Sequence, residues 1–359
     1  MRTLESPYMN WAKRRSSAKF NLATSGMPNV LLRDLPFEKE ELELTYGEYG
    51  YEPLLAAVAE KCGVASENVV LSFGTSMANH LAMAALIAPG DEVLIERPAY
   101  EMIVSAAEYL GADVVHFDRR YENGYRIDVQ EMSGQITDKT KLIVLTNLHN
   151  PSSVYEDEAT LKQIADAAAK VGAKVLIDEV YLDTMFEQAP RSSFHLAENI
   201  VVTNSLTKAY GLSGLRCGWI LADAATAQRM LRLNDLFAAT NVHVAERLSL
   251  IALHNLDIFR DRAKVLLGTN RPILDAFFDS RDDIDAVRTE HGTTAFPRLL
   301  RGDNVTLYKS LREKYETSVV PGSFFYAADH FRIGITCDTE MLRNGLERLG
   351  DALDELKVR

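Results

Sequence analysis

The sequence of 359 residues carries 51 acidic and 39 basic side chains, which leaves a formal net charge of −12. Hydrophobic residues make up 47% and charged residues 25% of the chain, so the composition is that of a globular protein, and the length predicts about two domains. The acidic balance argues against a nucleic-acid or anionic-membrane partner, because both require clustered Lys and Arg.

The spacing of cysteines and histidines excludes several kinds of site. Cys62, Cys217 and Cys337 are far apart and form no C-x-x-C pair, so neither a disulfide framework nor a zinc site is expected. The eight histidines show no metal-binding spacing, so we expect no metal. Residues 1–20 lack the apolar stretch of a signal peptide, and no run approaches the ~18 apolar residues of a membrane span. These features predict a reduced, cytoplasmic protein with no membrane partner.

Short apolar runs alternate with helical patterns between residues 69 and 221. The runs are rich in Val, Ile and Leu and mostly do not alternate with polar residues, which is typical of strands covered on both faces. We expect strands at 69–73, 93–96, 113–117, 142–146, 174–178, 200–203 and 217–221, and helices at 76–88 and 156–171. This order predicts a largely parallel sheet with helices on both faces.

The remainder of the chain has a different texture. Residues 223–278 read as mostly helix. Beyond them we expect strands at 295–300, 317–320 and 331–336, and helices at 304–314 and 338–356, which together predict a small α+β domain. The first 45 residues carry few strong signals.

Polar side chains follow four of the predicted strands at the point where each strand ends. They are Gly74-Thr75-Ser76, Asn150, Asp178 with Tyr181, and Lys208. Each has a plain structural explanation by itself, as a helix cap, a turn, a salt-bridge partner or a solvated lysine. The carboxyl ends of parallel strands meet at one edge, however, and ligands bind there. Pyridoxal phosphate would use all of them, because it needs a lysine for a Schiff base, an acid at its pyridine nitrogen and an anion site for its phosphate.

The segment around Lys208 carries a specific motif. Ser205-Leu206-Thr207-Lys208, followed by Gly211, Gly214, Arg216 and Gly218, resembles the lysine motif of class I and II aminotransferases, which are fold-type I pyridoxal-phosphate enzymes. The similarity runs from about residue 44 to 336. It implies a large domain at 45–258, with a mixed, mostly parallel seven-stranded sheet in which 217–221 is antiparallel. It also implies a small α+β domain made of 1–44 and 259–359.

The resemblance implies roles for the residues around the cofactor. Lys208 would form the Schiff base and move the proton at the substrate Cα, and Asp178 would pair with the pyridine nitrogen. The other contacts would be hydrogen bonds to the phenolic oxygen from Tyr181 and Asn150, ring stacking by Tyr100, and phosphate contacts from Thr75, Ser76, Ser205 and Arg216.

The resemblance also implies how substrate and a second subunit bind. Arg332 would grip the substrate α-carboxylate as a bidentate fork, with Asn150 and Gly26 beside the substrate. Tyr46 would reach the cofactor phosphate of a neighbouring subunit, which implies a homodimer with shared active sites. One departure is clear, because the family's Asn-Pro-x-Gly turn here ends in Ser153 instead of glycine.

The resemblance implies a transaminase that moves an amino group between an L-amino acid and a 2-oxo acid in a ping-pong reaction. A β-elimination lyase that cleaves C–S bonds would use the same fold and residues. A third class is an α/β-hydrolase, since Gly74-Thr75-Ser76-Met77-Ala78 resembles a degraded G-x-S-x-G elbow with Ser76 as nucleophile and a later histidine such as His330. That alternative leaves Lys208 unexplained. No second carboxylate-binding arginine is assigned, so the choice of amino acid stays open.

Overall fold

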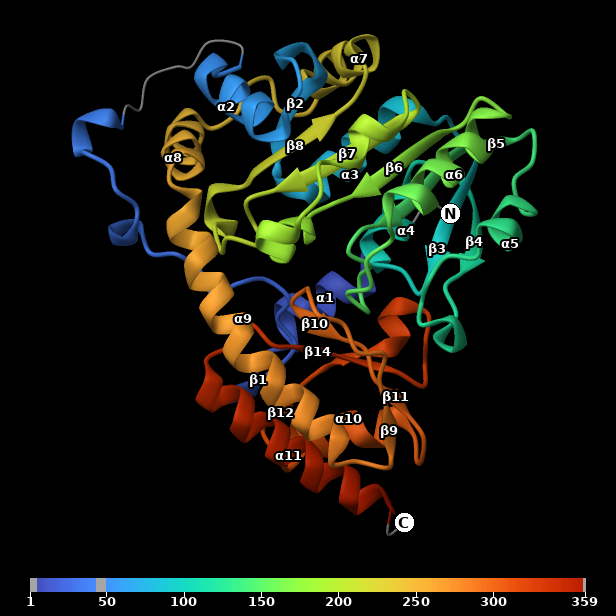
Figure 1. The fold of residues 1–359 in the computed structure, drawn as a ribbon, viewed down its shortest axis with the longest axis vertical. Helices are drawn as coiled ribbons and strands as arrows, with labels where there is room; N and C mark the ends of the chain where they lie inside the picture. The colour runs from blue at the N-terminus through green and yellow to red at the C-terminus, as the bar shows by residue number, and fades with distance from the viewer. Residues whose placement is uncertain (1–4, 43–49, 358–359) are drawn as a thin grey trace.

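The structure is a computed structural model that describes residues 5–42 and 50–357. Its central element is a seven-stranded sheet in the order β2-β8-β7-β6-β5-β3-β4 (Figure 1). The strands are β2 (Val69–Phe73), β3 (Glu92–Arg97), β4 (Asp113–Asp118), β5 (Thr140–Thr146), β6 (Lys174–Asp178), β7 (Ile200–Ser205) and β8 (Cys217–Leu221). Only β8 runs antiparallel to its neighbours β2 and β7 within this sheet. The predicted mixed, mostly parallel sheet with an antiparallel strand at 217–221 is therefore confirmed.

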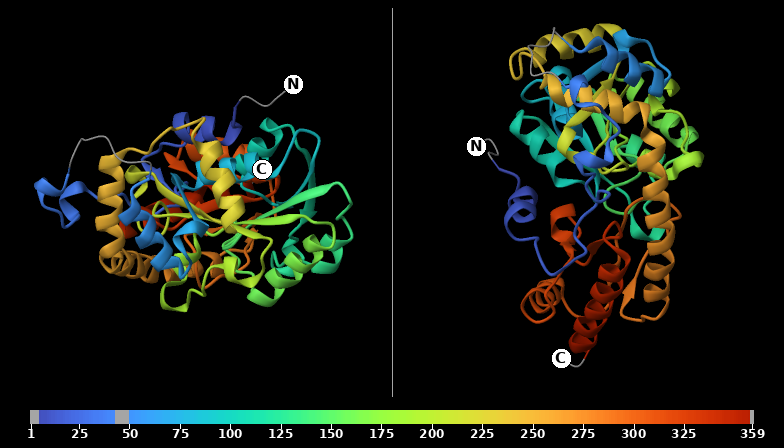
Figure 2. Two further views of the ribbon diagram at one scale, coloured as in Figure 1. Left: turned by 90° about the horizontal axis from the view of Figure 1, so that it is seen from above. Right: turned by 90° about the vertical axis from the view of Figure 1, so that its left-hand side faces the viewer.

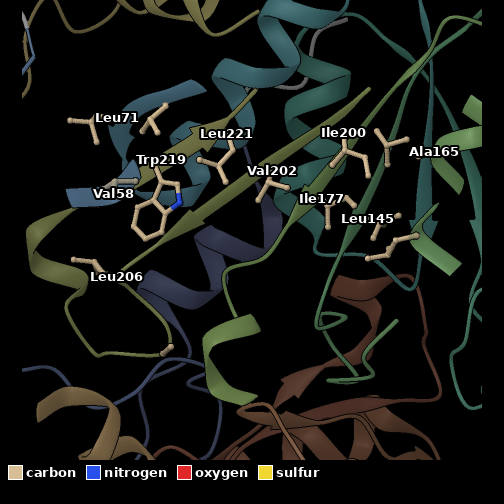
Figure 3. Close-up of a cluster of buried hydrophobic side chains, with 14 of the residues drawn as sticks. Val58, Leu71, Leu145, Ala165, Ile177, Ile200, Val202, Leu206, Trp219 and Leu221 are labelled. Carbon is tan, nitrogen blue, oxygen red and sulfur yellow. The ribbon is translucent and has the colours of Figure 1, made fainter. Parts of the chain in front are cut away.

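Helices cover both faces of the sheet. One face carries α2 (Glu52–Cys62), α5 (Val129–Ser133), α6 (Glu158–Ala169) and α8 (His243–His254), and the other carries α3 (Gly74–Leu86), α4 (Glu101–Tyr109) and α7 (Ala224–Asn234). Figure 3 shows Ile177, Val202 and Trp219 in the cluster on the first face. The alternate residues Leu176 and Val201 are buried on the second face. Because both faces are covered, the strands read as continuous apolar runs.

Two predicted helix boundaries shift for local reasons. The predicted helix 76–88 is α3, which begins at Gly74 because the chain turns there at a φ of +75°. The predicted helix 156–171 is α6, which begins at Glu158 with Asp157 as its N-cap. Glu156 stays outside the helix because its buried carboxylate forms an ion pair with Arg119. Strand β7 also extends to Ser205, so Asn204 and Ser205 lie within the strand and not after it.

A second body of short strands and long helices lies below the sheet in Figure 1. Its helices are α9 (Leu256–Asp279), α10 (Asn304–Glu313) and α11 (Thr339–Lys357). Its strands are β9 (Ile284–Asp285), β10 (Thr294–Ala295), β11 (Arg298–Leu299), β12 (Thr317–Ser318), β13 (Val320–Pro321) and β14 (Phe331–Gly334). The predicted strands 295–300 and 317–320 are each divided in two. In the first, the chain changes partner at Pro297, with β10 on β14 and β11 on β9.

The N-terminal segment connects the two bodies. It contains helix α1 (Pro7–Arg14) and strand β1 (Phe20–Asn21), which pairs in parallel with β12. Helix α9 runs along both bodies, as Figure 2 shows from the side. The predicted domain boundary at 258/259 falls in the first turn of α9, and the division into 45–258 against 1–44 with 259–359 stays a prediction. No helix among the described residues is both long and apolar enough to cross a membrane.

Candidate active site

A cavity of about 560 Å³ lies where the carboxyl ends of β5 and β6 meet α1 and the N-terminal segment. Thr146 ends β5 and Asp178 ends β6, and both line the cavity. The structure brings the residues predicted to contact the cofactor together in its wall, namely Thr75, Ser76, Tyr100, Asn150, Asp178, Tyr181, Ser205, Lys208 and Arg216. Tyr46, the remaining predicted cofactor residue, lies outside the described residues.

At one end of the cavity, Thr75, Ser205 and Arg216 form a group that we call the anion cradle, because it has the donors that an anion site needs. The Thr75 hydroxyl, in the first turn of α3, donates to the Ser205 hydroxyl at 2.7 Å. The Arg216 guanidinium forms no ion pair among the described residues and donates instead to the Phe73 carbonyl at 3.0 Å. A Cβ on Gly74 would lie 2.5 Å from Arg216 Nη2, so only glycine leaves room for that guanidinium. Free N–H groups at a helix N-terminus beside hydroxyls and a cation match the needs of a phosphate.

Asp178 is a buried acid with an oriented carboxylate. Its Oδ2 accepts from Asn79 Nδ2 at 2.8 Å, and its Oδ1 accepts from the Val180 backbone N–H at 3.0 Å. Asn79 is oriented in turn by the Thr203 hydroxyl, which donates to Asn79 Oδ1 at 2.5 Å. Burial raises the pKa of Asp178 to about 6, and these hydrogen bonds oppose that rise. The carboxylate is still mostly ionised at neutral pH and can pair with a protonated pyridine nitrogen.

Lys208 and Tyr181 meet at one hydroxyl. Lys208 Nζ donates to Ser25 Oγ at 3.1 Å, and the Tyr181 hydroxyl donates to the same atom at 2.9 Å. Burial lowers the pKa of Lys208, with the charge of Arg332 as a smaller cause in the same direction. A lysine with a lowered pKa is more often neutral and so better able to act as a base. Gly26 packs on this lysine, because a Cβ on Gly26 would lie 3.2 Å from Lys208 Cδ.

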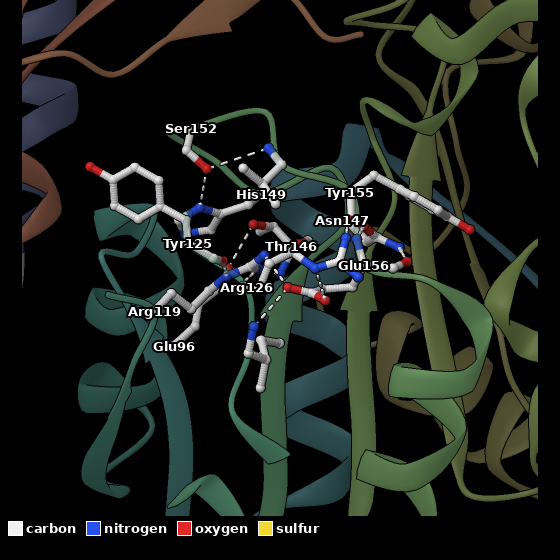
Figure 4. A network of polar contacts seen from close by, with 12 residues as sticks. Glu96, Arg119, Tyr125, Arg126, Thr146, Asn147, His149, Ser152, Tyr155 and Glu156 are labelled. Atoms are coloured by element: carbon white, nitrogen blue, oxygen red, sulfur yellow. Dashed lines mark hydrogen bonds and ion pairs between the residues drawn. The ribbon is translucent and has the colours of Figure 1, made fainter. Parts of the chain in front are cut away.

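Asn150 is positioned by a chain of buried hydrogen bonds that runs through Thr146, Glu96 and Arg119, and Figure 4 shows these three residues together. Its backbone N–H donates to Thr146 Oγ1 at 2.8 Å, and the Thr146 hydroxyl donates to Glu96 Oε1 at 2.6 Å. Arg119, whose side chain is 0% exposed, pairs with Glu96 at 2.8 Å and with Glu156 at 2.9 Å. Burial raises the pKa of Glu96 to about 7, against the charge of Arg119. The ion pairs thus anchor the loop that carries Asn150.

The segment that carries Tyr100 is fixed from the same loop. His149 Nε2 lies 2.9 Å from the Pro98 carbonyl oxygen, and His149 Nδ1 lies 2.6 Å from Ser152 Oγ. Burial lowers the pKa of His149 well below its ordinary value, so the ring is neutral. It therefore donates from Nε2 to the carbonyl and accepts at Nδ1 from the Ser152 hydroxyl. The Tyr100 ring lines the cavity two residues beyond Pro98.

Arg332, predicted to bind the substrate carboxylate, lies in β14 behind the cavity wall and is 1% exposed. Nη1 donates to Asn150 Oδ1 at 3.0 Å, and Nη2 donates to the Tyr8 hydroxyl and the Ala23 carbonyl at 3.2 Å each. Nε is buried without a partner among the described residues. Arg332 thus pairs with no surface acid, and a buried cation in this state gains from an arriving carboxylate.

The turn without its glycine keeps a glycine-like backbone. Ser153 adopts a φ of +64°, the left-handed conformation that glycine adopts without strain. The Ser153 hydroxyl donates to the Thr294 carbonyl at 2.9 Å, and the Thr294 hydroxyl donates to the Pro151 carbonyl at 3.0 Å. These bonds connect the loop after β5 to β10 in the second body, and they offset the strain at Ser153.

The hydrolase alternative finds no support in this geometry. His330 Nδ1 is hydrogen-bonded to Asp329 at 2.7 Å, and its ring stacks on Phe296 at a centroid distance of 4.7 Å. Neither His330 nor Asp329 is in the wall of the cavity that Ser76 lines. His330 is therefore not placed to act as a general base for Ser76.

Among the polar residues that line the cavity, Tyr8, Ser25 and Asn79 were not singled out from the sequence. Asn79 has a usable signal, since an amide stands in the apolar stretch of α3 one turn after Thr75. Thr207 lies in the lysine motif, and its hydroxyl is buried without a partner among the described residues. Tyr8 and Ser25 have no such signal, because only tertiary contacts bring the N-terminal segment to the sheet. A buried acid, a base, an anion cradle and this unpartnered hydroxyl fit pyridoxal phosphate.

Comparisons with known proteins agree with the site. A family described as "Aminotransferase class I and II" matches residues 26–349. Capreomycidine synthase of Streptomyces vinaceus is 30% identical in an alignment that covers 97% of this chain and 93% of the synthase. An arginine–pyruvate transaminase of Pseudomonas aeruginosa is 28% identical, covering 82% of this chain and 76% of its own. A pyridoxal-phosphate-dependent aminotransferase of Streptococcus suis superposes with a TM-score of 0.92 at 25% identity, over 99% of both chains. Since the family match extends over nearly the whole chain, this protein belongs to the class I and II aminotransferases, which depend on pyridoxal phosphate.

Proposed function

We propose that this chain transfers an amino group between an L-amino acid and a 2-oxo acid in two half-reactions, with pyridoxal phosphate bound in the cavity described above. The observation that carries the proposal is the shared cavity of Asp178 and Lys208, with Arg332 hydrogen-bonded directly behind its wall. When bound, pyridoxal phosphate withdraws electrons from the substrate Cα and makes its proton removable.

The residues of the chain then have distinct tasks. Lys208, with its pKa lowered by burial, would take the proton from the Cα of the amino donor in one half-reaction and deliver a proton to the Cα of the new amino acid in the other. Asp178 stabilises positive charge on the pyridine nitrogen, and Tyr181 and Asn150 hold the phenolic oxygen. Thr75, Ser76, Ser205 and Arg216 bind the phosphate, Tyr100 stacks on the ring, and Arg332, Asn150 and Gly26 position the substrate. Each assignment is our proposal, as is the division into the two domains.

We also propose that a second copy of this chain completes the site, so that the protein is a homodimer. A second hollow shares Ser76, Asn79 and Tyr100 with the first and extends to Tyr109. Large apolar side chains lie exposed near it, with Leu236 at 78% and Phe237 at 55% exposure. His80 links the two features through ring contacts with Tyr109 and Phe237. An apolar surface beside an active site is typical of a protein interface.

Sedimentation tests the dimer. Wild type should sediment as a dimer, whereas Phe237→Glu should shift the equilibrium toward the monomer. A monomeric wild type contradicts the proposed homodimer.

A cytoplasmic location is part of the same proposal and is supported by the three free cysteines, Cys62, Cys217 and Cys337.

A panel of amino donors tests the activity. Purified chain loaded with pyridoxal phosphate should absorb visible light, and a true donor should remove that absorbance until a 2-oxo acid restores it. Lys208→Ala should lose the visible band that depends on the lysine. The panel should include arginine and aspartate, because relatives are named for them. If no donor changes the absorbance, the proposal fails.

The same panel decides the lyase alternative. One relative is named a synthase and not a transaminase, which justifies the comparison. Stoichiometric transfer to an added 2-oxo acid supports the transaminase. Pyruvate and ammonia released without any acceptor support β-elimination instead.

A further inference from the structure

Helix α1 places a tyrosine directly between the cavity and the buried Arg332. Tyr8 lines the cavity and is 8% exposed, whereas the Arg332 side chain behind it is 1% exposed. The Tyr8 hydroxyl oxygen accepts a hydrogen bond from Arg332 Nη2 at 3.2 Å. Among the described residues, Tyr8 and Asn150 therefore form the wall through which a ligand would reach this guanidinium.

The ring of Tyr8 is held by its neighbours. It packs edge-on against Tyr100 with centroids 5.6 Å apart and against Phe324 at 5.8 Å, and it lies 6.1 Å from Trp11. Helix α1 is itself anchored, because Trp11 Nε1 donates to the Tyr308 hydroxyl at 2.6 Å. Removing the hydroxyl alone should leave these contacts in place, so the role of the hydroxyl can be tested apart from the fold.

The acceptors around Arg332 are neutral. Its partners are the Asn150 amide oxygen, the Tyr8 hydroxyl and the Ala23 carbonyl, and no carboxylate pairs with it among the described residues. A neutral oxygen is a weaker partner for a guanidinium than a carboxylate, which forms shorter, charge-assisted bonds. The Tyr8 hydroxyl oxygen thus accepts from Arg332 Nη2, a donor to which a carboxylate would bind more strongly.

We propose that Tyr8 gates the carboxylate site: its hydroxyl holds Arg332 in the ligand-free protein and is displaced when the α-carboxylate of the substrate binds. The inference rests on the proposed function, because it takes Arg332 as the carboxylate-binding residue. It adds a determinant of substrate affinity that lies in α1, outside the strand-end residues. Displacing Tyr8 lowers affinity for every ligand that carries an α-carboxylate and leaves ligands without one unaffected.

Tyr8→Phe tests the gate with an unreactive ligand. A 2-methyl amino acid carries the α-carboxylate but has no proton on Cα, so its binding to the loaded enzyme is read from the visible absorbance without turnover. We expect Tyr8→Phe to bind it about tenfold more tightly than wild type, which corresponds to about 1.4 kcal/mol. The matching amine without a carboxylate should bind both proteins equally. Tyr8→Leu, which removes the hydroxyl together with the ring, should also bind the 2-methyl amino acid more tightly than wild type.

Tyr125→Phe is the matched control. Tyr125 is also buried, and its hydroxyl has no hydrogen-bond partner among the described residues and is not part of the cavity wall. Its variant should bind the 2-methyl amino acid as wild type does. Unchanged or weaker binding by Tyr8→Phe, beside a responsive wild type, overturns the gate alone. A wild type that binds pyridoxal phosphate but no carboxylate ligand overturns the proposed function together with the gate.

Discussion

Thr146→Val removes one hydroxyl from the buried chain that positions Asn150. Thr146 Oγ1 accepts from the Asn150 N–H at 2.8 Å and donates to Glu96 Oε1 at 2.6 Å. Valine has nearly the same shape as threonine but no hydroxyl. The change therefore leaves the buried Asn150 N–H without its acceptor and the Glu96 carboxylate with one donor fewer. An unsatisfied buried group costs about 1–3 kcal/mol, and a hydrogen bond to a charged group contributes about 1.5–3 kcal/mol. Because Glu96 keeps its hydrogen bonds from the Thr146 N–H and from Arg119, we expect the lower part of the summed range, a fall of about 2.5–4 kcal/mol in the free energy of unfolding.

Thr140→Val is an internal control at the other end of the same strand. The Thr140 hydroxyl is also buried, accepts from the Thr137 N–H at 2.9 Å and donates to a glutamate of β3, Glu92. Its hydrogen-bond pattern is therefore that of Thr146, but it lies at the end of β5 remote from the cavity. Both variants should lose stability in urea unfolding of the cofactor-free chain, and Thr140→Val should lose less because Glu92 is only half-buried.

Only the variant near the cavity should change the site. Because Asn150 Oδ1 also accepts from Arg332, a displaced Asn150 should weaken binding of pyridoxal phosphate and of carboxylate ligands by about tenfold, as one lost hydrogen bond would. Titration of the visible absorbance measures both affinities. The reasoning is refuted if Thr146→Val unfolds as wild type does, or if Thr140→Val weakens both affinities equally.

Three further predictions concern single positions. Burial raises the pKa of Asp178 from 3.8 to about 6, so between these values the folded chain holds a proton that the unfolded chain has released. The unfolding free energy of cofactor-free wild type should therefore fall by about 2 kcal/mol relative to Asp178→Asn as pH rises from 4 to 6, and a pH-independent difference contradicts this. Ser153→Gly should be about 1 kcal/mol more stable than Ser153→Ala in urea unfolding, because alanine keeps the unfavourable positive φ; the reverse order would exclude strain at this turn. Gly74→Ala should weaken pyridoxal-phosphate binding at least about tenfold, because its Cβ would displace Arg216. Gly268→Ala is the control, since a Cβ there would meet no atom within 4 Å, and it should leave the affinity unchanged. Equal affinities of the two variants would count against the anion cradle.

The sheet was predictable because strands buried on both faces appear in the sequence as short runs of apolar residues. The strands at Val69–Phe73, Lys174–Asp178 and Cys217–Leu221 have the predicted bounds, since each is a continuous apolar run with turn residues beside it. The small strands were less predictable. Where the chain changes partner at Pro297, two-residue strands carry too little pattern to be separated.

The sequence by itself determined the residues at the strand ends and the lysine motif, because both depend on local order along the chain. Asp178 could be proposed from its position at the end of a strand and Lys208 from its position just after one, and both line one cavity. Only the tertiary structure decided what surrounds them. The Ser25 hydroxyl between Lys208 and Tyr181, and the Tyr8 hydroxyl on Arg332, come from a segment far away in the sequence. Such contacts depend on how the N-terminal segment packs against β14 and the sheet, which no periodicity or spacing within that segment records.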